Sequence, residues 1–196
     1  TRLQPVVLLT GQAAGMLAAL AVLQKKEVSQ VPVQLVQDAL LKAKCYLMPF
    51  SDVPVTDPDW EAIQRAGLAG VLKGVGKPEG WANKMFFYPD SLVNGSEFLS
   101  GLYRYGRFFT SHHRLNAGPE MSVSQAFRLL RRLRPFMKTD AFKNIMKDEE
   151  WRELWPALGL KNFDPVRPIT RRELAVLVDK CTRIKYHPNL IMDIKG

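Results

Sequence analysis

The hydrophobic and polar positions of this chain predict helices along most of its length. Apolar residues recur about every 3.6 positions, which places them on one face of a helix. No convincing strand-type alternation of useful length accompanies them, and the stretch 74–80, which contains Gly and Pro, is expected to be a loop. We therefore predict a mainly α fold. The segments with a helical period are 11–26, 33–46, 60–72, 140–146 and 149–158.

A short pattern occurs three times in the second half of the chain. Each copy begins with an apolar residue, followed by Asn, Ser or Thr, then by two variable positions and then by Glu or Gln. An amphipathic run follows each copy. This order predicts a capping box, in which the Asn, Ser or Thr side chain accepts from a first-turn N–H and the Glu or Gln reaches back. Three boxes that are each preceded directly by an apolar residue indicate one helical unit used repeatedly. The copies are 93–97, 121–125 and 169–173.

An almost wholly apolar stretch, residues 5–23, lies near the start of the chain. Its length is marginal for a transmembrane helix, which needs about 20 apolar residues. A signal peptide would carry its positive charge ahead of the apolar stretch. We favour a helix buried on all sides within a larger protein, and no transmembrane segment. The opening residues Thr1 and Arg2 then mark an internal boundary of that protein.

A turn-rich stretch between residues 49 and 58 predicts a domain boundary. It contains three prolines and two aspartates in ten positions, a composition typical of loops. A chain of 196 residues allows one or two domains. We expect one or two helices in residues 1–48 and a bundle of repeated helical units in residues 49–196.

The formal net charge is +9, and the basic residues concentrate between positions 101 and 138, where Glu120 is the only acidic residue. Such a patch suits an anionic partner, which could be nucleic acid, an acidic polysaccharide or a membrane surface. A solvated helix face is the simpler explanation. No nucleic-acid recognition motif accompanies the patch, so we do not expect nucleic acid as the partner. The basic residues are Arg104, Arg107, Arg114, Arg128, Arg131, Arg132, Arg134 and Lys138.

The sequence offers no catalytic residue and no metal site. Its two cysteines, Cys45 and Cys181, fit neither a metal spacing nor a disulfide framework. The adjacent His112 and His113 make a poor metal pair, because neighbouring side chains point apart on regular structure. The acidic run 148–150 is explained by the dipole of a following helix, which favours acids in its first turn.

From residue 50 to about 107, and again around the third capping box, the chain resembles S-layer homology repeats. The resemblance implies helix–loop–helix units packed about a pseudo-threefold axis. Many members of that family bind an anionic cell-wall polysaccharide in grooves between the units, at the cell envelope or outside the cytoplasm. The matching residues are Phe50-Ser51-Asp52-Val53, Trp60, Ala62-Ile63, Ala66-Gly67, Gly70–Gly74, Phe87-Tyr88-Pro89-Asp90, Glu97-Phe98, Leu158–Lys161, Phe163-Asp164-Pro165 and Pro168–Ala175.

The binding motif of that family maps onto Thr170 and Arg171 only. Asn94-Gly95 and Ser122-Val123 stand where the other copies would have Thr-Arg. A groove without its Arg loses the bidentate grip on carboxylate or phosphate. We therefore do not expect three working polysaccharide sites, and the three boxes have a purely structural alternative as caps of core helices.

A second resemblance covers about residues 4–48. The sequence LTGQAAGMLAALA at 9–21 looks like the last FAD-contacting helix of flavin-dependent oxidoreductases, where a Gly-Gln-Ala-Ala-Gly turn opens a small-residue helix beside the flavin. Amides at a helix N-terminus carry partial positive charge that can stabilise flavin oxygens. The resemblance implies FAD contacts at Gly11, Gln12, Ala13, Ala14 and Gly15.

The Gly-x-Gly-x-x-Gly that holds the FAD pyrophosphate does not occur in the chain. The resemblances together therefore imply the C-terminal part of a larger FAD-dependent oxidoreductase, followed by a degenerate S-layer-homology-like region. The expected partner is the remainder of the FAD-binding domain, and the fragment alone is not expected to retain FAD or activity. The alternative is a non-enzymatic cell-wall or carbohydrate-binding module, with nucleic-acid binding as a weaker third hypothesis.

Overall fold

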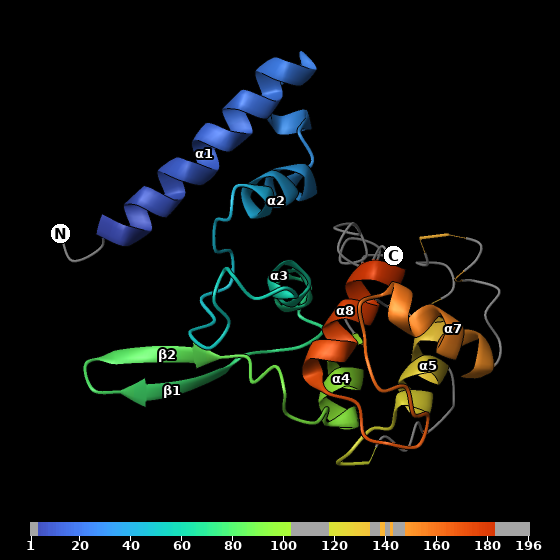
Figure 1. Ribbon diagram of the computed structural model, residues 1–196. Helices are drawn as coiled ribbons and strands as arrows, with labels where there is room; N and C mark the ends of the chain where they lie inside the picture. Colours follow the sequence, from blue (N-terminus) through green and yellow to red (C-terminus); the bar gives the residue numbers. More distant parts are fainter. Residues whose placement is uncertain (1–3, 103–117, 134–137, 140–141, 143–147, 183–196) are drawn as a thin grey trace, which may run out of the picture. The chain divides into compact units, whose positions relative to one another are not determined.

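The computed structural model describes the chain except for residues 1–3, 103–117, 134–137, 140–141, 143–147 and 183–196 (Figure 1). The chain divides into two compact units, residues 1–47 (unit 1) and residues 48–196 (unit 2). The described residues are mainly helical, which confirms the predicted class, and their one sheet has two strands.

Unit 1 is built from two helices joined by a short 3-10 turn. The elements are α1 (Gln4–Gln24), η1 (Val28–Gln30) and α2 (Val33–Lys42). One side of α1 packs on η1 and α2 through a small core cluster that includes Ala21, Val31, Val36 and Leu40. The helix starts seven residues earlier than predicted, because nothing in the apolar run before Gly11 interrupts it.

Both helices of unit 1 end sooner than their apolar patterns predict, each at a lysine in the left-handed conformation. Lys25 has φ of 52° and Lys44 has φ of 60°. After α1, the N–H of Lys26 donates to the carbonyl of Ala21 at 3.0 Å and that of Lys25 to Val22 at 3.1 Å. This is the Schellman pattern, which normally uses glycine at the left-handed position.

Unit 2 begins with α3 (Trp60–Leu68), which packs against α8 (Arg171–Cys181). Its chain then turns at Gly70, with φ of 68°, where a side chain would be strained. The other helices among the described residues of unit 2 are α4 (Gly95–Leu102), α5 (Val123–Arg132) and α7 (Asp148–Ala157). The predicted helix 140–146 lies mostly outside the described residues.

A β-hairpin follows α3 where the sequence predicts a loop, so that prediction is wrong. Strands β1 (Val75–Glu79) and β2 (Ala82–Phe86) pair antiparallel, in a register that sets Lys77 opposite Lys84. Gly80, with φ of 59°, lies in the turn. The hairpin extends away from the helices of unit 2 (Figure 1). Most of its residues are exposed, so it has no apolar face, and the alternation that signals a strand is missing.

The three apolar residues that precede the capping boxes meet in a closed cycle of backbone hydrogen bonds. The N–H of Val93 donates to the carbonyl of Ile169 at 3.0 Å, that of Ile169 to Met121 at 2.9 Å, and that of Met121 to Val93 at 3.2 Å. All three side chains are buried, none more than 1% exposed. We call this arrangement the hydrogen-bonded ring. It brings together the starts of α4, α5 and α8, which are separated by up to 76 positions in the sequence.

A second set of backbone bonds runs round the ring in the opposite sense. Each donor is the residue two positions after a ring residue, and each acceptor precedes the next ring residue by two or three positions. Every neighbouring pair of segments is therefore held by two bonds, as in a very short antiparallel pairing. The bonds are Gly95 N–H to Gly118 at 3.3 Å, Val123 N–H to Arg167 at 3.0 Å and Arg171 N–H to Ser91 at 2.9 Å.

Two of the three predicted capping boxes are confirmed in full. Ser122 accepts from the N–H of Gln125 at 3.2 Å, and the Gln125 side chain accepts from the N–H of Ser122 at 2.8 Å. The pair Thr170 and Glu173 has the same geometry, at 3.2 and 3.0 Å. In the first copy, Asn94 accepts from the N–H groups of Ser96 and Glu97 at 2.9 and 3.1 Å. The Glu97 carboxylate in that copy binds Arg171 instead.

Aromatic rings fill the core between α5 and α7. Phe127 stacks on Trp151 with ring centroids 4.2 Å apart and meets Trp155 edge to face at 5.9 Å. The Trp155 indole N–H donates to the carbonyl of Lys161 at 2.9 Å, so its polar atom is satisfied inside the core. The α7 helix ends at Ala157, and the predicted stop residue Gly159, with φ of 81°, follows two positions later.

Candidate functional site

The five residues predicted to contact FAD lie in the middle of α1. The helix begins at Gln4, so the amides of residues 11–15 are inside the helix, where they donate to carbonyls four positions earlier. The expectation that they form a helix N-terminus is wrong, because the preceding apolar run continues the helix. Ala13 packs partly on the core cluster, and the Gln12 amide donates to the Cys45 sulfur at 2.8 Å. Whether the five residues contact a cofactor stays a prediction.

The side of α1 that faces away from its core cluster is apolar and exposed. Large residues occupy both of its ends: Leu8 is 73% exposed and Leu23 is 79% exposed. A Cβ built on Gly11 or Gly15 meets no atom within 4 Å, so another chain segment has room to approach closely there. We call this surface the outer face. Its residues are Val7, Leu8, Gly11, Ala14, Gly15, Ala18, Ala19, Val22 and Leu23.

By length and composition alone, one segment of α1, Val6–Gln24, could cross a membrane. Its mean hydropathy is 2.1, and only 6% of it is buried. A helix that belongs in the core of a larger protein has the same length and composition. Length and composition therefore do not separate a membrane span from a core helix.

Thr170 and Arg171, the predicted polysaccharide contacts, both make internal bonds. Thr170 caps α8. Arg171 is only 5% exposed, and its guanidinium lies over the Phe87 ring at 4.8 Å. Its Nε donates to the Phe87 carbonyl at 2.7 Å, its Nη1 to both Glu97 oxygens at 3.2 Å, and its Nη2 to the Lys73 carbonyl. All three guanidinium nitrogens therefore bind groups within unit 2, although ligand binding at these residues stays a prediction.

Arg172 gathers three carboxylates that the sequence does not connect. Its Nη1 donates to Asp57 at 2.6 Å and to Asp59 at 3.3 Å, and its Nε donates to Asp90 at 3.0 Å. The hydrogen bond to Asp57 raises the pKa of Arg172 further above its usual range. Burial would raise the pKa of Asp57, but the hydrogen bonds from Arg172 and from the Asp59 N–H outweigh burial and lower it.

These bonds fix the start of α8 against the loop before α3. The two partners Arg172 and Asp57 are 115 positions apart in sequence, so no local pattern predicts their contact. The one available signal is the doubled Arg in the third capping box, which the other two copies lack. Each of the three carboxylates accepts a hydrogen bond from Arg172, so we interpret the cluster as a structural element of unit 2.

The remaining candidates give no catalytic geometry among the described residues. His112 and His113 lie outside the described residues, as do Arg104, Arg107, Arg114 and Arg134 of the basic patch. Within the described part of the chain, no group of three His, Cys, Asp or Glu side chains could hold a metal ion. Both cysteines are free thiols, and burial raises the pKa of Cys181 to about 12, which keeps it protonated and unreactive.

One family matches part of the chain. The family described as FAD dependent oxidoreductase matches residues 1–40. No curated protein and no solved structure matches the chain. The matched residues include α1 with its outer face, so the N-terminal segment of this chain is similar to a part of the FAD-dependent oxidoreductases.

Proposed function

We propose that this chain is the C-terminal part of an FAD-dependent oxidoreductase, in which unit 1 completes the FAD-binding domain and unit 2 is an S-layer-homology-like accessory domain. The observation that carries the proposal is the family match to residues 1–40, because it falls on the helix with the uncovered outer face. The cofactor of the complete protein is then FAD, and the partner of α1 is the rest of the FAD-binding domain.

The outer face supports this partner by its shape as well as by its polarity. Small residues at positions 11, 14, 15, 18 and 19 form a strip along α1, and such a strip lets a neighbouring backbone or a planar ring come close. Covering one large apolar side chain contributes roughly 1.5–3 kcal/mol. A flavin domain that covers Leu8, Val22 and Leu23 therefore gains several such contributions.

The accessory role of unit 2 is supported by the hydrogen-bonded ring. Three helices that start from one ring, each after a buried apolar residue and a capping residue, are what three related helix–loop–helix units about a common axis would produce. We propose structural roles for Thr170 and Arg171, because their side chains cap α8 and bind Glu97. An S-layer-homology-like unit would hold the enzyme at the cell envelope, through surfaces other than the Arg171 guanidinium.

The test uses the protein encoded by the complete reading frame that contains this chain. We expect it to carry a strand followed by Gly-x-Gly-x-x-Gly, and to purify with FAD visible in its absorbance spectrum. The Gly15→Leu variant places a large side chain on the outer face and should strongly reduce the bound FAD. Gly76→Leu is the matched control, because a Cβ at Gly76 also meets no atom within 4 Å but lies in β1 of unit 2.

The same two variants in the 196-residue chain separate folding from docking. Leucine favours helix more than glycine does by roughly 0.8–1 kcal/mol, so Gly15→Leu should leave the chain folded by circular dichroism. A reading frame without a dinucleotide-binding motif, or equal FAD in the two full-length variants, would overturn the proposal.

A further inference from the structure

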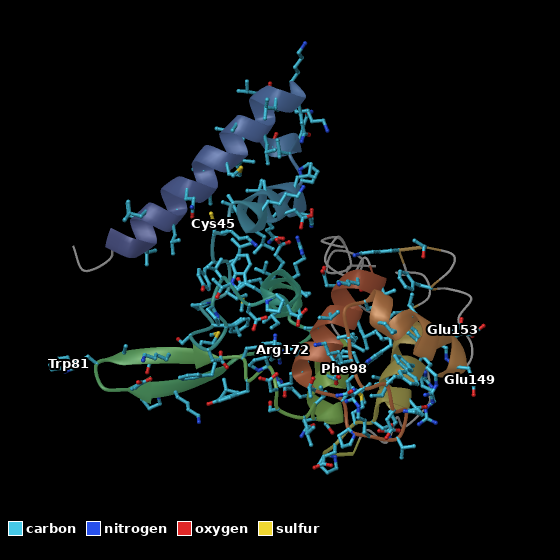
Figure 2. All side chains as sticks on the ribbon, in the orientation of Figure 1. Cys45, Trp81, Phe98, Glu149, Glu153 and Arg172 are labelled. Atoms are coloured by element: carbon cyan, nitrogen blue, oxygen red, sulfur yellow. The ribbon has the colours of Figure 1, made fainter. Side chains whose placement is uncertain are left out.

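The β-hairpin of unit 2 ends in the most exposed large apolar side chain of the described residues. Trp81 has a relative exposure of 107%, and Figure 2 shows it at the turn end of the hairpin, pointing away from both strands. The other three tryptophans of the chain, Trp60, Trp151 and Trp155, are each 1% exposed. A fully exposed indole has a large apolar surface in water, and this placement needs a physical reason.

The base of the hairpin is held firmly while its end is free. The Met85 carbonyl accepts from the N–H of Ser51 at 2.8 Å, and the Asp52 carboxylate accepts from the N–H groups of Phe87 and Tyr88 at 2.8 and 2.6 Å. Beyond this base, both strands are exposed along most of their length. A two-stranded hairpin is only marginally stable alone, and here the hydrogen bonds at its base hold it on unit 2. The turn with Trp81 therefore has a defined position although unit 2 does not cover it.

Two lysines face each other behind the tip. The strand register pairs Lys77 with Lys84 on one face of the hairpin, where like charges directly opposite each other are destabilising. Lys84 is partly offset by Glu79 at 2.9 Å, and Lys77 lies over the Tyr88 ring at 5.2 Å. Lys73 is also exposed at the base of the hairpin. The segment 73–88 therefore contains three positively charged residues and one negatively charged residue.

We propose that the hairpin binds the surface of an anionic lipid membrane, with Trp81 in the interfacial layer and Lys77 and Lys84 against the lipid headgroups. Indole rings favour the boundary between headgroups and acyl chains, and lysines near an anionic leaflet are attracted by its surface potential. The positions along the hairpin match that boundary, because Trp81 lies at the tip and the Lys77–Lys84 pair lies nearer the base.

The shape of the tip favours a membrane over an acidic polysaccharide or a protein pocket. A sugar site is a concave surface with polar groups beside the aromatic ring. Here the two turn residues, Gly80 and Trp81, carry no polar side chain, and Trp81 projects from the end of the hairpin (Figure 2). A projecting indole needs a partner that deforms around it, and the interface of a fluid bilayer does so. The proposal does not depend on the function proposed above, since every observation behind it concerns the hairpin and its base.

The experiment exploits the exposure of the four tryptophans. In the 196-residue chain, acrylamide quenches mainly Trp81, because the other three indoles are buried. We expect vesicles of equal parts phosphatidylcholine and phosphatidylserine to shift the emission to shorter wavelength and to protect it from acrylamide, with a smaller effect for pure phosphatidylcholine. Unit 1 contains no tryptophan, so vesicle binding through α1 alone leaves this signal unchanged.

Variants assign the signal to the hairpin. Trp81→Ala should remove the protected emission, and the double variant Lys77→Gln and Lys84→Gln should lower the vesicle partition coefficient measured through Trp81 by roughly thirtyfold, as two lysines at an anionic surface imply. The matched controls are Lys161→Gln, an exposed lysine, and Val166→Ala, an apolar residue that is 80% exposed, both in unit 2. Neither control should change the partition coefficient.

Three results would overturn the proposal. The first is unchanged acrylamide quenching with the anionic vesicles. The second is equal protection by neutral and anionic vesicles that persists in the double lysine variant. The third is protection by an acidic polysaccharide such as polygalacturonate together with none by vesicles, which would assign the hairpin to a glycan.

Discussion

Unit 1 and unit 2 differ in how completely they bury their apolar residues. In unit 1, α1 packs one side on a small cluster around Val36 and Leu40 and leaves the outer face in water. In unit 2, large side chains such as Trp60, Phe127 and Trp155 are almost fully buried. A helix that is apolar on all sides is usually buried on all sides, whereas α1 is buried on one side only. The comparison shows that unit 2 has an extensive core of its own, while unit 1 leaves a large apolar face exposed.

Phe127→Ala should have the largest effect on stability. The ring stacks on Trp151 and contacts Trp155 and Phe163, so truncation removes apolar burial and leaves a cavity, at a cost of roughly 3–5 kcal/mol. Urea unfolding followed by near-ultraviolet circular dichroism measures the loss. A cost below about 1 kcal/mol, in the range of surface substitutions, would mean that unit 2 lacks the rigid core that separates it from unit 1.

Arg171→Ala should have the second-largest effect and lower the unfolding free energy by about 3 kcal/mol. This value is the lower end of the cost of removing one partner of a buried ion pair. The lower end applies because the Glu97 side chain is 35% exposed, so solvent partly compensates it. The double variant Arg171→Met and Glu97→Gln should recover part of the loss, since no buried charge is then left unpaired. If Arg171 instead serves only a ligand, its replacement by Ala will leave the unfolding free energy unchanged.

Arg172→Ala should cost about 2 kcal/mol near neutral pH, as for hydrogen bonds to charged groups. The pKa of Asp57 is lower in the folded chain than its ordinary 3.8. Its contribution to stability is therefore present above that value, and it is lost as the pH falls through the lower folded pKa. The difference in unfolding free energy between the natural chain and the variant should shrink below about pH 4. A difference that grows on acidification would contradict the assignment.

The sequence predicts local features of this fold well and long-range ones poorly. The capping boxes at Ser122 and Thr170 follow from residues three positions apart, and both are confirmed. The stop at Gly159 follows from a glycine's access to positive φ. The ends of α1 and α2 were missed because Lys25 and Lys44 occupy the same left-handed position, where lysine gives no signal.

Local patterns mark some of the residues that join distant segments, but they do not identify the partners of those residues. The bond between Arg172 and Asp57 and the hydrogen-bonded ring depend on how helices meet after they form. The hairpin was missed for a different reason: its strands are paired only to each other and are mostly exposed, so they lack the alternation that burial imposes. Gly11 to Gly15 lie inside α1 and not at its start because the apolar run before them continues the helix.

Leu8→Gln should have the smallest effect, and it tests the other half of the comparison. Leu8 is 73% exposed, and Leu and Gln have similar helix propensities, so the unfolding free energy of the 196-residue chain should change by no more than about 0.5 kcal/mol. The variant should also aggregate less, because a charge-free apolar face promotes association. A loss above about 1 kcal/mol would mean that Leu8 is covered within the chain itself. The outer face would then need no flavin domain to complete it, and the contrast between the two units would disappear.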